Sequence, residues 1–90
     1  MASVIFTRHL IRYFPDLQDA DFEGEDLLSV IQTIEQQHPG FSEYIVDEQG
    51  RLRKHVNIFI DSEPITDRVH LSDQITPQST IHFIQALSGG

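Results

Sequence analysis

One amphipathic segment in the first half of the chain constrains the fold more than any other feature of the 90 residues. Five residues recur at the three- and four-residue spacing of one helical face, and Leu28 widens this stripe. Asp26 before the segment is a favoured N-cap residue, and Pro39-Gly40 after it is typical of a helix end. The sequence therefore predicts a helix whose stripe packs into the core, and the stripe consists of Leu27, Val30, Ile31, Ile34 and His38.

The two ends of the chain have the character of strands. Residues 3–10 begin as an apolar run and then alternate, which predicts a first strand with Val4, Phe6 and Leu10 on one face. Residues 80–87 are apolar and rich in β-branched side chains, which predicts a last strand. The last strand can return beside the first.

Between the first strand and the helix, the sequence predicts a wide connection and a short strand. Residues 13–17 contain Pro15, which cannot donate a hydrogen bond to a neighbouring strand. Residues 19–23 are predicted to form a second strand that points Phe22 inward. Gly24 is then expected to turn the chain into the helix.

The segments after the helix are short and irregular. Residues 41–45 are predicted to form a short helical turn that packs Phe41 and Ile45 under the helix end. Residues 47–50 are predicted to form a turn. Residues 71–75 are expected to be a loop that contains one helical turn.

The clearest strand after the helix spans residues 53–60, where apolar and polar residues alternate. Its alternation predicts that Phe59 points outward with Asn57 and Asp61, which leaves a large aromatic ring on the wet face. A turn and a short strand over residues 64–66 are predicted to follow. The inward residues of the long strand are Val56, Ile58 and Ile60.

This order of elements is strand, strand, helix, strand, short strand, strand. An initial hairpin followed by one helix, with the last strand beside the first, is an α+β arrangement. We therefore expect a β-grasp fold, with a mixed sheet of four to five strands wrapped around one main helix.

The charge of the chain is negative and unevenly distributed. Fourteen acidic residues against six Lys and Arg give a net charge of -8. Ten of the acids lie between Asp16 and Glu48, a range without Lys or Arg, and the basic residues gather at Arg8, Arg12 and residues 51–54. Such a field repels phosphate backbones, so no nucleic-acid binding is expected. A basic protein partner and simple solvation both remain compatible with it.

Several classes of chemistry and location are excluded by residues that the sequence lacks. The chain has no cysteine, which excludes disulfides, a thiol nucleophile, thiolate metal sites and a protein persulfide. Its five histidines have no paired ligand spacing, and no enzyme motif occurs, so neither a metal site nor an active site is expected. No run approaches the ~20 apolar residues of a membrane span, and we expect a cytoplasmic protein without membrane contact.

The sequence ends abruptly on two glycines, three residues after the predicted last strand. Gly89 and Gly90 lack Cβ atoms, so they could thread a channel that excludes any side chain. The reactive group would then be the α-carboxylate of Gly90, which needs activation, usually by ATP. The alternative is a frayed terminus with no role of its own.

With these features in place, the chain resembles the ubiquitin-like sulfur carriers of the MoaD and ThiS type along essentially its whole length. The resemblance rests on residues 23–27 entering the helix, residues 56–60 in the middle strand, and residues 87–90 at the end. The long segment of residues 41–54 looks most like the longer bacterial carriers that supply sulfur for cysteine synthesis.

The resemblance implies a carrier and not an enzyme. In it, the Gly90 carboxylate is adenylated by an ATP-dependent adenylyltransferase similar to the ubiquitin-activating enzymes, and a sulfur-donating enzyme converts it to a thiocarboxylate. A downstream biosynthetic enzyme accepts the sulfide for cysteine, molybdopterin, thiamin or another metabolite. No cofactor is bound, because ATP and the sulfur donor serve the partner enzymes. Residues 1–90 would be one domain, with Leu87 anchoring a flexible tail of Ser88, Gly89 and Gly90.

The resemblance also implies an outward apolar patch on the sheet that meets the activating enzyme. The candidates are Phe59 and Ile84, with His82 on the same face as Ile84 by alternation and Thr7 at the margin. A family position that is often aromatic is Ile84 in this chain. An isolated surface aromatic without a partner is the alternative reading of Phe59.

Two other functions fit the same sequence. A ubiquitin-like modifier would use the activated Gly90 carboxylate to form an isopeptide bond with lysines of target proteins. A plain β-grasp interaction domain would have an inert tail.

Overall fold

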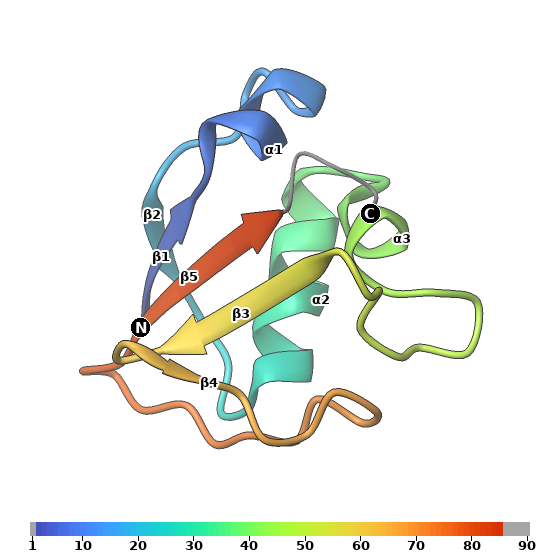
Figure 1. The fold of residues 1–90 in the computed structure, drawn as a ribbon. Coiled ribbons are helices and arrows are strands. Elements are labelled where there is room, and N and C mark those ends of the chain that lie inside the picture. The colour runs from blue at the N-terminus through green and yellow to red at the C-terminus, as the bar shows by residue number, and fades with distance from the viewer. Residues whose placement is uncertain (1, 86–90) are drawn as a thin grey trace.

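The computed structural model of the chain describes residues 2–85 (Figure 1). Five strands and three helices follow one another in this part of the chain. In chain order they are β1 (Ala2–Phe6), α1 (Arg8–Tyr13), β2 (Ala20–Phe22), α2 (Leu27–Gln37), α3 (Phe41–Ile45), β3 (Val56–Ile60), β4 (Glu63–Pro64) and β5 (Thr80–Gln85).

The five strands form one mixed sheet in the order β2-β1-β5-β3-β4. The first and last strands, β1 and β5, pair in parallel at its centre, whereas the other three pairings are antiparallel. Figure 1 shows α2 crossing one face of this sheet. The predicted β-grasp fold, with the last strand returning beside the first, is confirmed.

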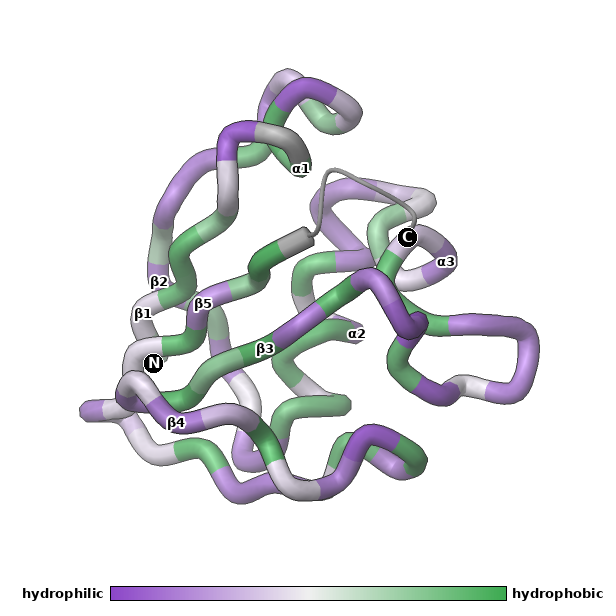
Figure 2. Tube along the Cα trace, in the orientation of Figure 1, coloured by the Kyte–Doolittle hydropathy of each residue, from purple (hydrophilic) through white to green (hydrophobic). Residues whose placement is uncertain are grey.

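The core lies between the sheet and α2, and aromatic rings join its parts. The Phe6 ring stacks on the Phe83 ring with centroids 5.6 Å apart, and Phe41 meets both rings edge-on at 5.7 and 5.5 Å. Figure 2 shows that β3 and β5 are mostly hydrophobic, and their buried residues Val56, Ile58, Ile81 and Phe83 face this core. From α2 the core receives Leu27, Val30, Ile31 and Ile34.

The helix stripe is therefore confirmed, although it is narrower than predicted. Leu28 is 40% exposed and does not widen the core face. His38 is the C-cap residue and lies half-buried just beyond the helix. Asp26 is the N-cap as predicted, and its carboxylate accepts a hydrogen bond from the Ser29 N–H at 2.8 Å.

The start of α2 is completed by the loop between β4 and β5. A helix leaves its first N–H groups without partners inside the helix. Here the Leu27 N–H donates to the Asp73 carbonyl and the Leu28 N–H to the Leu71 carbonyl, both at 3.0 Å. Leu71 is fully buried, so the loop and the helix start are held by both packing and hydrogen bonds.

The junction between α2 and α3 is held by Glu35. Its carboxylate accepts hydrogen bonds from the Ser42 N–H at 2.8 Å and the Gly40 N–H at 2.9 Å. These bonds, with that from Ser42 first, hold the pKa of Glu35 below its usual value. Gly40 adopts a φ of 97°, which explains why a glycine follows the helix. The predicted short helix of residues 41–45, with Phe41 and Ile45 buried, is confirmed as α3.

The predicted first strand of residues 3–10 is wrong after Phe6. The first strand ends there, and the N–H groups of Leu10 and Ile11 donate to the Thr7 carbonyl at the start of α1. Leu10 is buried as expected, but from a helix. Leu10 and Phe14 are four residues apart, so a helical turn brings both side chains to the core. Burial of these two side chains favours the helix over the strand that the alternation in residues 3–10 predicts.

Three other boundaries differ from the prediction. The third strand begins at Val56, because the chain turns with the Val56 N–H donating to the Arg53 carbonyl. The short strand is Glu63–Pro64 and not residues 64–66, because Asp61 and Ser62, both with positive φ, form a two-residue hairpin turn. No helical turn occurs within the described loop of residues 71–75.

A second carboxylate, that of Asp67, holds the first part of the loop between β4 and β5 by hydrogen bonds. The Asp67 carboxylate accepts hydrogen bonds from the backbone N–H groups of Val69 and His70, at 3.1 and 2.8 Å, and from the Ser72 hydroxyl. The bonds from His70 and Ser72 are the largest causes that lower the pKa of Asp67 to about 2. The ionised form of Asp67 is therefore the form that the folded loop favours.

Replacing Gly24 should destabilise the fold more than replacing another turn glycine. A Cβ at Gly24 would lie 2.6 Å from Val30 Cγ2 and 2.7 Å from the Val30 backbone nitrogen, which α2 holds in place. We expect Gly24→Ala to lower the free energy of unfolding by about 2–4 kcal/mol. The control is Gly50→Ala, where φ is 81° but no atom lies within 4 Å; its expected cost is about 1 kcal/mol. Urea denaturation measures both, and equal losses would contradict the clash.

The hydrogen bonds to Asp67 should make stability depend on pH. Because its folded pKa lies below the unfolded value, its contribution is present above about pH 4 and is lost as the pH falls toward 2. We expect the stability difference between the wild type and Asp67→Asn to shrink over that window.

The control for this measurement is Asp16→Asn. Asp16 is exposed, and its carboxylate accepts no hydrogen bond from the described residues. Denaturant unfolding at successive pH values should therefore give no such convergence for this variant. A constant difference for Asp67→Asn down to pH 2 would contradict the role of its ionised form.

Candidate functional site

The sheet face that points away from α2 carries a row of side chains across four strands. In the sheet register His82 of β5 lies opposite Ile5 of β1 and opposite Phe59 of β3, and Phe59 in turn lies opposite Pro64 of β4. Their neighbours in sequence, such as Phe6, Ile58 and Phe83, are buried in the core. The row therefore lies on the outer face.

Ile84 extends this row toward the end of β5. It is 36% exposed, and it lies opposite Asn57 in the register. We use the name outer patch for Ile5, Phe59, Pro64, His82 and Ile84. Three of the four candidates from the sequence, Phe59, His82 and Ile84, thus come together on one face, and their role in binding stays a prediction.

Phe59 differs from the other phenylalanines of the chain. The chain has six, and five of their rings form the connected cluster around Phe41 in the core. Phe59 lies half-buried on the outer face instead. A ring left outside the core, in a row with other apolar groups, is the feature expected of a surface that binds a partner.

Thr7 is placed differently from the sequence expectation. It is the N-cap residue of α1, and its N–H donates to the Phe83 carbonyl at 3.2 Å. Its hydroxyl oxygen is buried and has no hydrogen-bond partner among the described residues. Thr7 is therefore beside the end of β5 but does not present its hydroxyl on the outer patch.

Sequence reasoning missed two members of the outer patch, Ile5 and Pro64. Ile5 alternates with the buried Val4 and Phe6, so its outward direction was available from the strand pattern. Its position beside His82 was not, because no local signal gives the register of a parallel pair. The position of Pro64 opposite Phe59 was not available either, because it depends on where the hairpin turn lies.

The predicted reactive end, Leu87, Ser88, Gly89 and Gly90, lies outside the described residues. The structure describes the base from which it continues. β5 pairs on one side with β1 and on the other with β3, up to the pairing of Gln85 with Val56. The pairing with β1 ends at Phe83, so the last two residues of β5 are paired with β3 alone.

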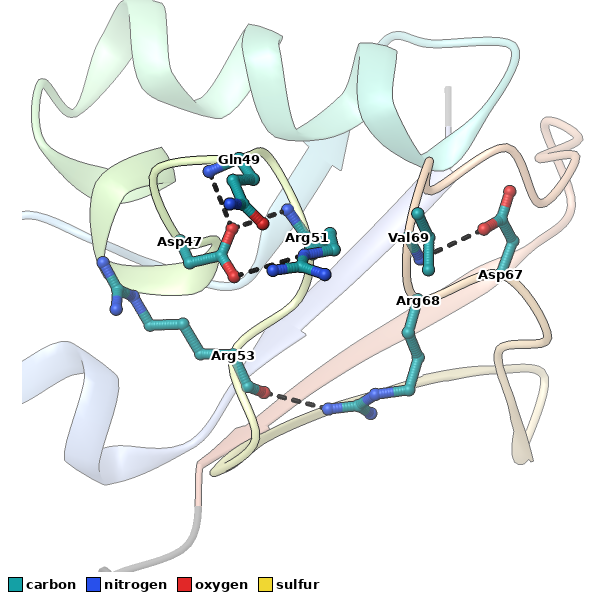
Figure 3. A network of polar contacts seen from close by, with 7 residues as sticks. All are labelled: Asp47, Gln49, Arg51, Arg53, Asp67, Arg68 and Val69. Atoms are coloured by element: carbon teal, nitrogen blue, oxygen red, sulfur yellow. Dashed lines mark hydrogen bonds and ion pairs between the residues drawn. The ribbon is translucent and has the colours of Figure 1, made fainter.

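A polar network stands beside this strand end (Figure 3). The Arg68 guanidinium donates to the backbone carbonyls of Arg53 at 2.9 Å and Val56 at 2.8 Å. The Arg53 guanidinium donates to the Glu43 carbonyl at 2.9 and 3.1 Å. The nearby Asp47 carboxylate accepts from the backbone N–H of Arg51 and pairs with its side chain. The network fixes the turn that leads into β3.

No group of three or more His, Asp or Glu side chains in residues 2–85 is arranged to hold a metal ion. In the same part of the chain, every helix is too short or too polar to cross a membrane.

Solved structures share this fold over almost the whole chain. One is the crystal structure of the Amycolatopsis orientalis BexX/CysO complex, with a TM-score of 0.85 and 19% identity over 100% of both chains. Another is Mycobacterium tuberculosis CysO, with a TM-score of 0.83 and 22% identity over 97% of this chain and 100% of that one. A third is SAMP1 from Haloferax volcanii, with a TM-score of 0.76 and 15% identity over 99% and 98%.

At these identities the similarity establishes the fold, which is the ubiquitin-like β-grasp expected from the sequence. No curated protein sequence matches the chain. The sequence of residues 11–90 does match the ThiS family. Because this match spans most of the chain and reaches its last residue, the chain belongs to the ThiS family.

Proposed function

We propose that this protein is a sulfur carrier whose Gly90 carboxylate is adenylated and then converted to a thiocarboxylate. The observation that carries the proposal is the family match, which includes the Leu87-Ser88-Gly89-Gly90 end. The resemblance seen in the sequence assigns the chemistry to that end. The protein is then a substrate of other enzymes and acts in the cytoplasm.

The absence of cysteine from the whole chain agrees with this chemistry. A carrier without a thiol must bear sulfur elsewhere, and the terminal carboxylate can do so after activation. ATP converts the Gly90 carboxylate to an acyl-adenylate with release of pyrophosphate. A sulfur donor then displaces AMP, and the resulting thiocarboxylate delivers sulfide to a biosynthetic enzyme. ATP and sulfur belong to the partner enzymes, so the carrier itself needs no cofactor.

The geometry supports docking of an adenylyltransferase on the outer patch. His82 and Ile84 lie on β5, the strand that leads directly to the reactive end. A partner that covers Phe59 and Ile84 would therefore also lie close to the point where the tail begins. The complex of BexX with CysO, whose fold is shared, is consistent with a carrier that binds a partner protein.

The likeness to SAMP1, a small archaeal modifier protein, keeps conjugation as a second function. A modifier would use the same adenylate but would transfer Gly90 to a target lysine. An inert tail on an interaction domain is the third possibility. The product of activation separates the three.

Intact mass spectrometry tests the proposal directly. After incubation with ATP, sulfide and a ThiS-family adenylyltransferase, we expect the full chain to gain the mass difference between sulfur and oxygen. The chain without Gly90 should fold normally and gain no mass. Adducts with lysine-containing proteins instead would favour the modifier, and an unchanged mass with an active enzyme would favour an inert tail.

Truncating the outer patch should weaken activation without unfolding the chain. We expect Phe59→Ala to raise the KM of adenylation for the carrier by about 5- to 30-fold, because a buried interface aromatic contributes about 1–2 kcal/mol. Leu28→Ala is the control, since Leu28 is an exposed large apolar residue that lies on α2, away from the outer patch. Pyrophosphate release measures both variants. Equal KM values would place the docking surface elsewhere.

A further inference from the structure

Five of the six Lys and Arg residues of this acidic protein lie around one end of the sheet. Arg8 and Arg12 are on α1, which follows β1 at the end where the parallel β5 also finishes. Arg53 and Lys54 precede β3, whose first residue pairs with the last of β5. These four residues, with Arg68, flank the end of β5, and we name the five the basic collar.

The basic collar forms no ion pair within the described residues. Arg53 and Arg68 donate to backbone carbonyls and form no ion pair with a carboxylate of the described residues, although the charge of Arg53 helps to lower the pKa of the nearby Asp47. Arg8, Arg12 and Lys54 are exposed. Within the described part of the chain, the ion pair present is Arg51–Asp47, at 3.6 Å and outside the collar. The chain has fourteen acidic residues and six Lys and Arg, so acids are available to pair with every cation. The fold keeps the collar cations out of such pairs.

The opposite end of the sheet is acidic. Asp61 and Glu63 follow the end of β3, and Asp21 lies opposite Ser3 near the start of β1. Glu23 and Glu25 follow β2 on the same side, beside Ala2 and Pro77. Lys and Arg are absent from this end, so it is more negative than the collar end, where Glu43, Asp47 and Glu48 lie beside Arg53 but the other collar cations offset them.

We propose that the basic collar binds an acidic protein surface around the entrance to the adenylyltransferase active site. This inference rests on the proposed function. An acidic rim would attract the collar and repel the far end of the sheet, so the carrier would approach with its tail first. The outer patch then supplies the apolar contact, while the collar sets the orientation and the association rate.

A protein surface fits the collar better than a free nucleotide does. The cations come from three separate segments on both sides of β5, and they do not converge on one cavity. The cavity that contains Arg53, about 650 Å³ in volume, is also lined by Glu43, Asp47 and Glu48. A phosphate in this cavity would meet one guanidinium and three carboxylates, whereas a protein surface can contact the exposed Arg8, Arg12 and Lys54 outside it.

Peptide titration tests the collar without any enzyme. The full-length ¹⁵N-labelled chain is titrated with hexaglutamate at low salt, and amide shifts are followed by NMR. We expect shifts in α1 and residues 53–56, but not at residues 61–64 or 76–79. Shifts spread evenly over the chain, or none, would overturn the proposal. Larger shifts of the same amides with ATP alone would assign the collar to phosphate and overturn it as well.

Activation kinetics then test the role of the collar in the carrier reaction. We expect Lys54→Gln and Arg8→Gln each to lower kcat/KM for the carrier by about 2- to 5-fold at low salt. Gln78→Glu changes net charge by the same amount, is exposed, and lies at the far end of the sheet, so it should leave kcat/KM unchanged. The differences should vanish in about 1 M salt, where the Debye length is about 3 Å.

The outcomes separate the two proposals. Normal thiocarboxylate formation with equal kcat/KM for Lys54→Gln and Gln78→Glu would overturn the collar alone. No thiocarboxylate from the wild type with an active enzyme would overturn the proposed function, and with it the partner assigned to the collar. Circular dichroism of each variant excludes unfolding as the cause of a lower rate.

Discussion

The parallel pairing of β1 with β5 is the interaction on which the rest of the structure depends. It joins residues that lie 77 positions apart in the sequence, from Ser3 with Thr80 to Phe6 with Phe83. Their stacked rings form the centre to which Phe22 and Phe41 add from β2 and α3. The other strands are added on either side of this pair: β2 pairs with β1, β3 pairs with β5, and β4 pairs with β3.

The same pairing determines both faces of the sheet. Side chains alternate along β5, so burying Ile81 and Phe83 against α2 leaves His82 and Ile84 on the outer face. The register then sets Ile5 and Phe59 beside His82. The core and the outer patch are therefore two consequences of one alignment, and a slip by one residue would exchange them.

Loop residues provide hydrogen-bond partners for the ends of the helices and strands. The first N–H groups of α2 donate hydrogen bonds to carbonyls of the loop of residues 71–73, and Glu35 connects the end of α2 to α3. Arg68 bonds to the carbonyls of Arg53 and Val56, which holds the start of β3 beside the end of β5. Polar side chains such as Glu35 and Arg68 thus hold the loops by hydrogen bonds to backbone groups. The exposed side chains of Arg8, Arg12 and Lys54 take no part in these bonds.

The sequence by itself determined the helix over 27–37, its Asp26 cap, the inward and outward sides of β3, and the glycine end, because periodicity and capping act over a few residues. It did not determine α1, since a single helical turn between Thr7 and Phe14 competes locally with strand alternation. The tertiary structure alone decided that Ile5 and Pro64 join Phe59 and that the basic residues gather at one end. Both depend on which strands pair and in what register, and that is set by burial of the whole core and not by neighbours in sequence.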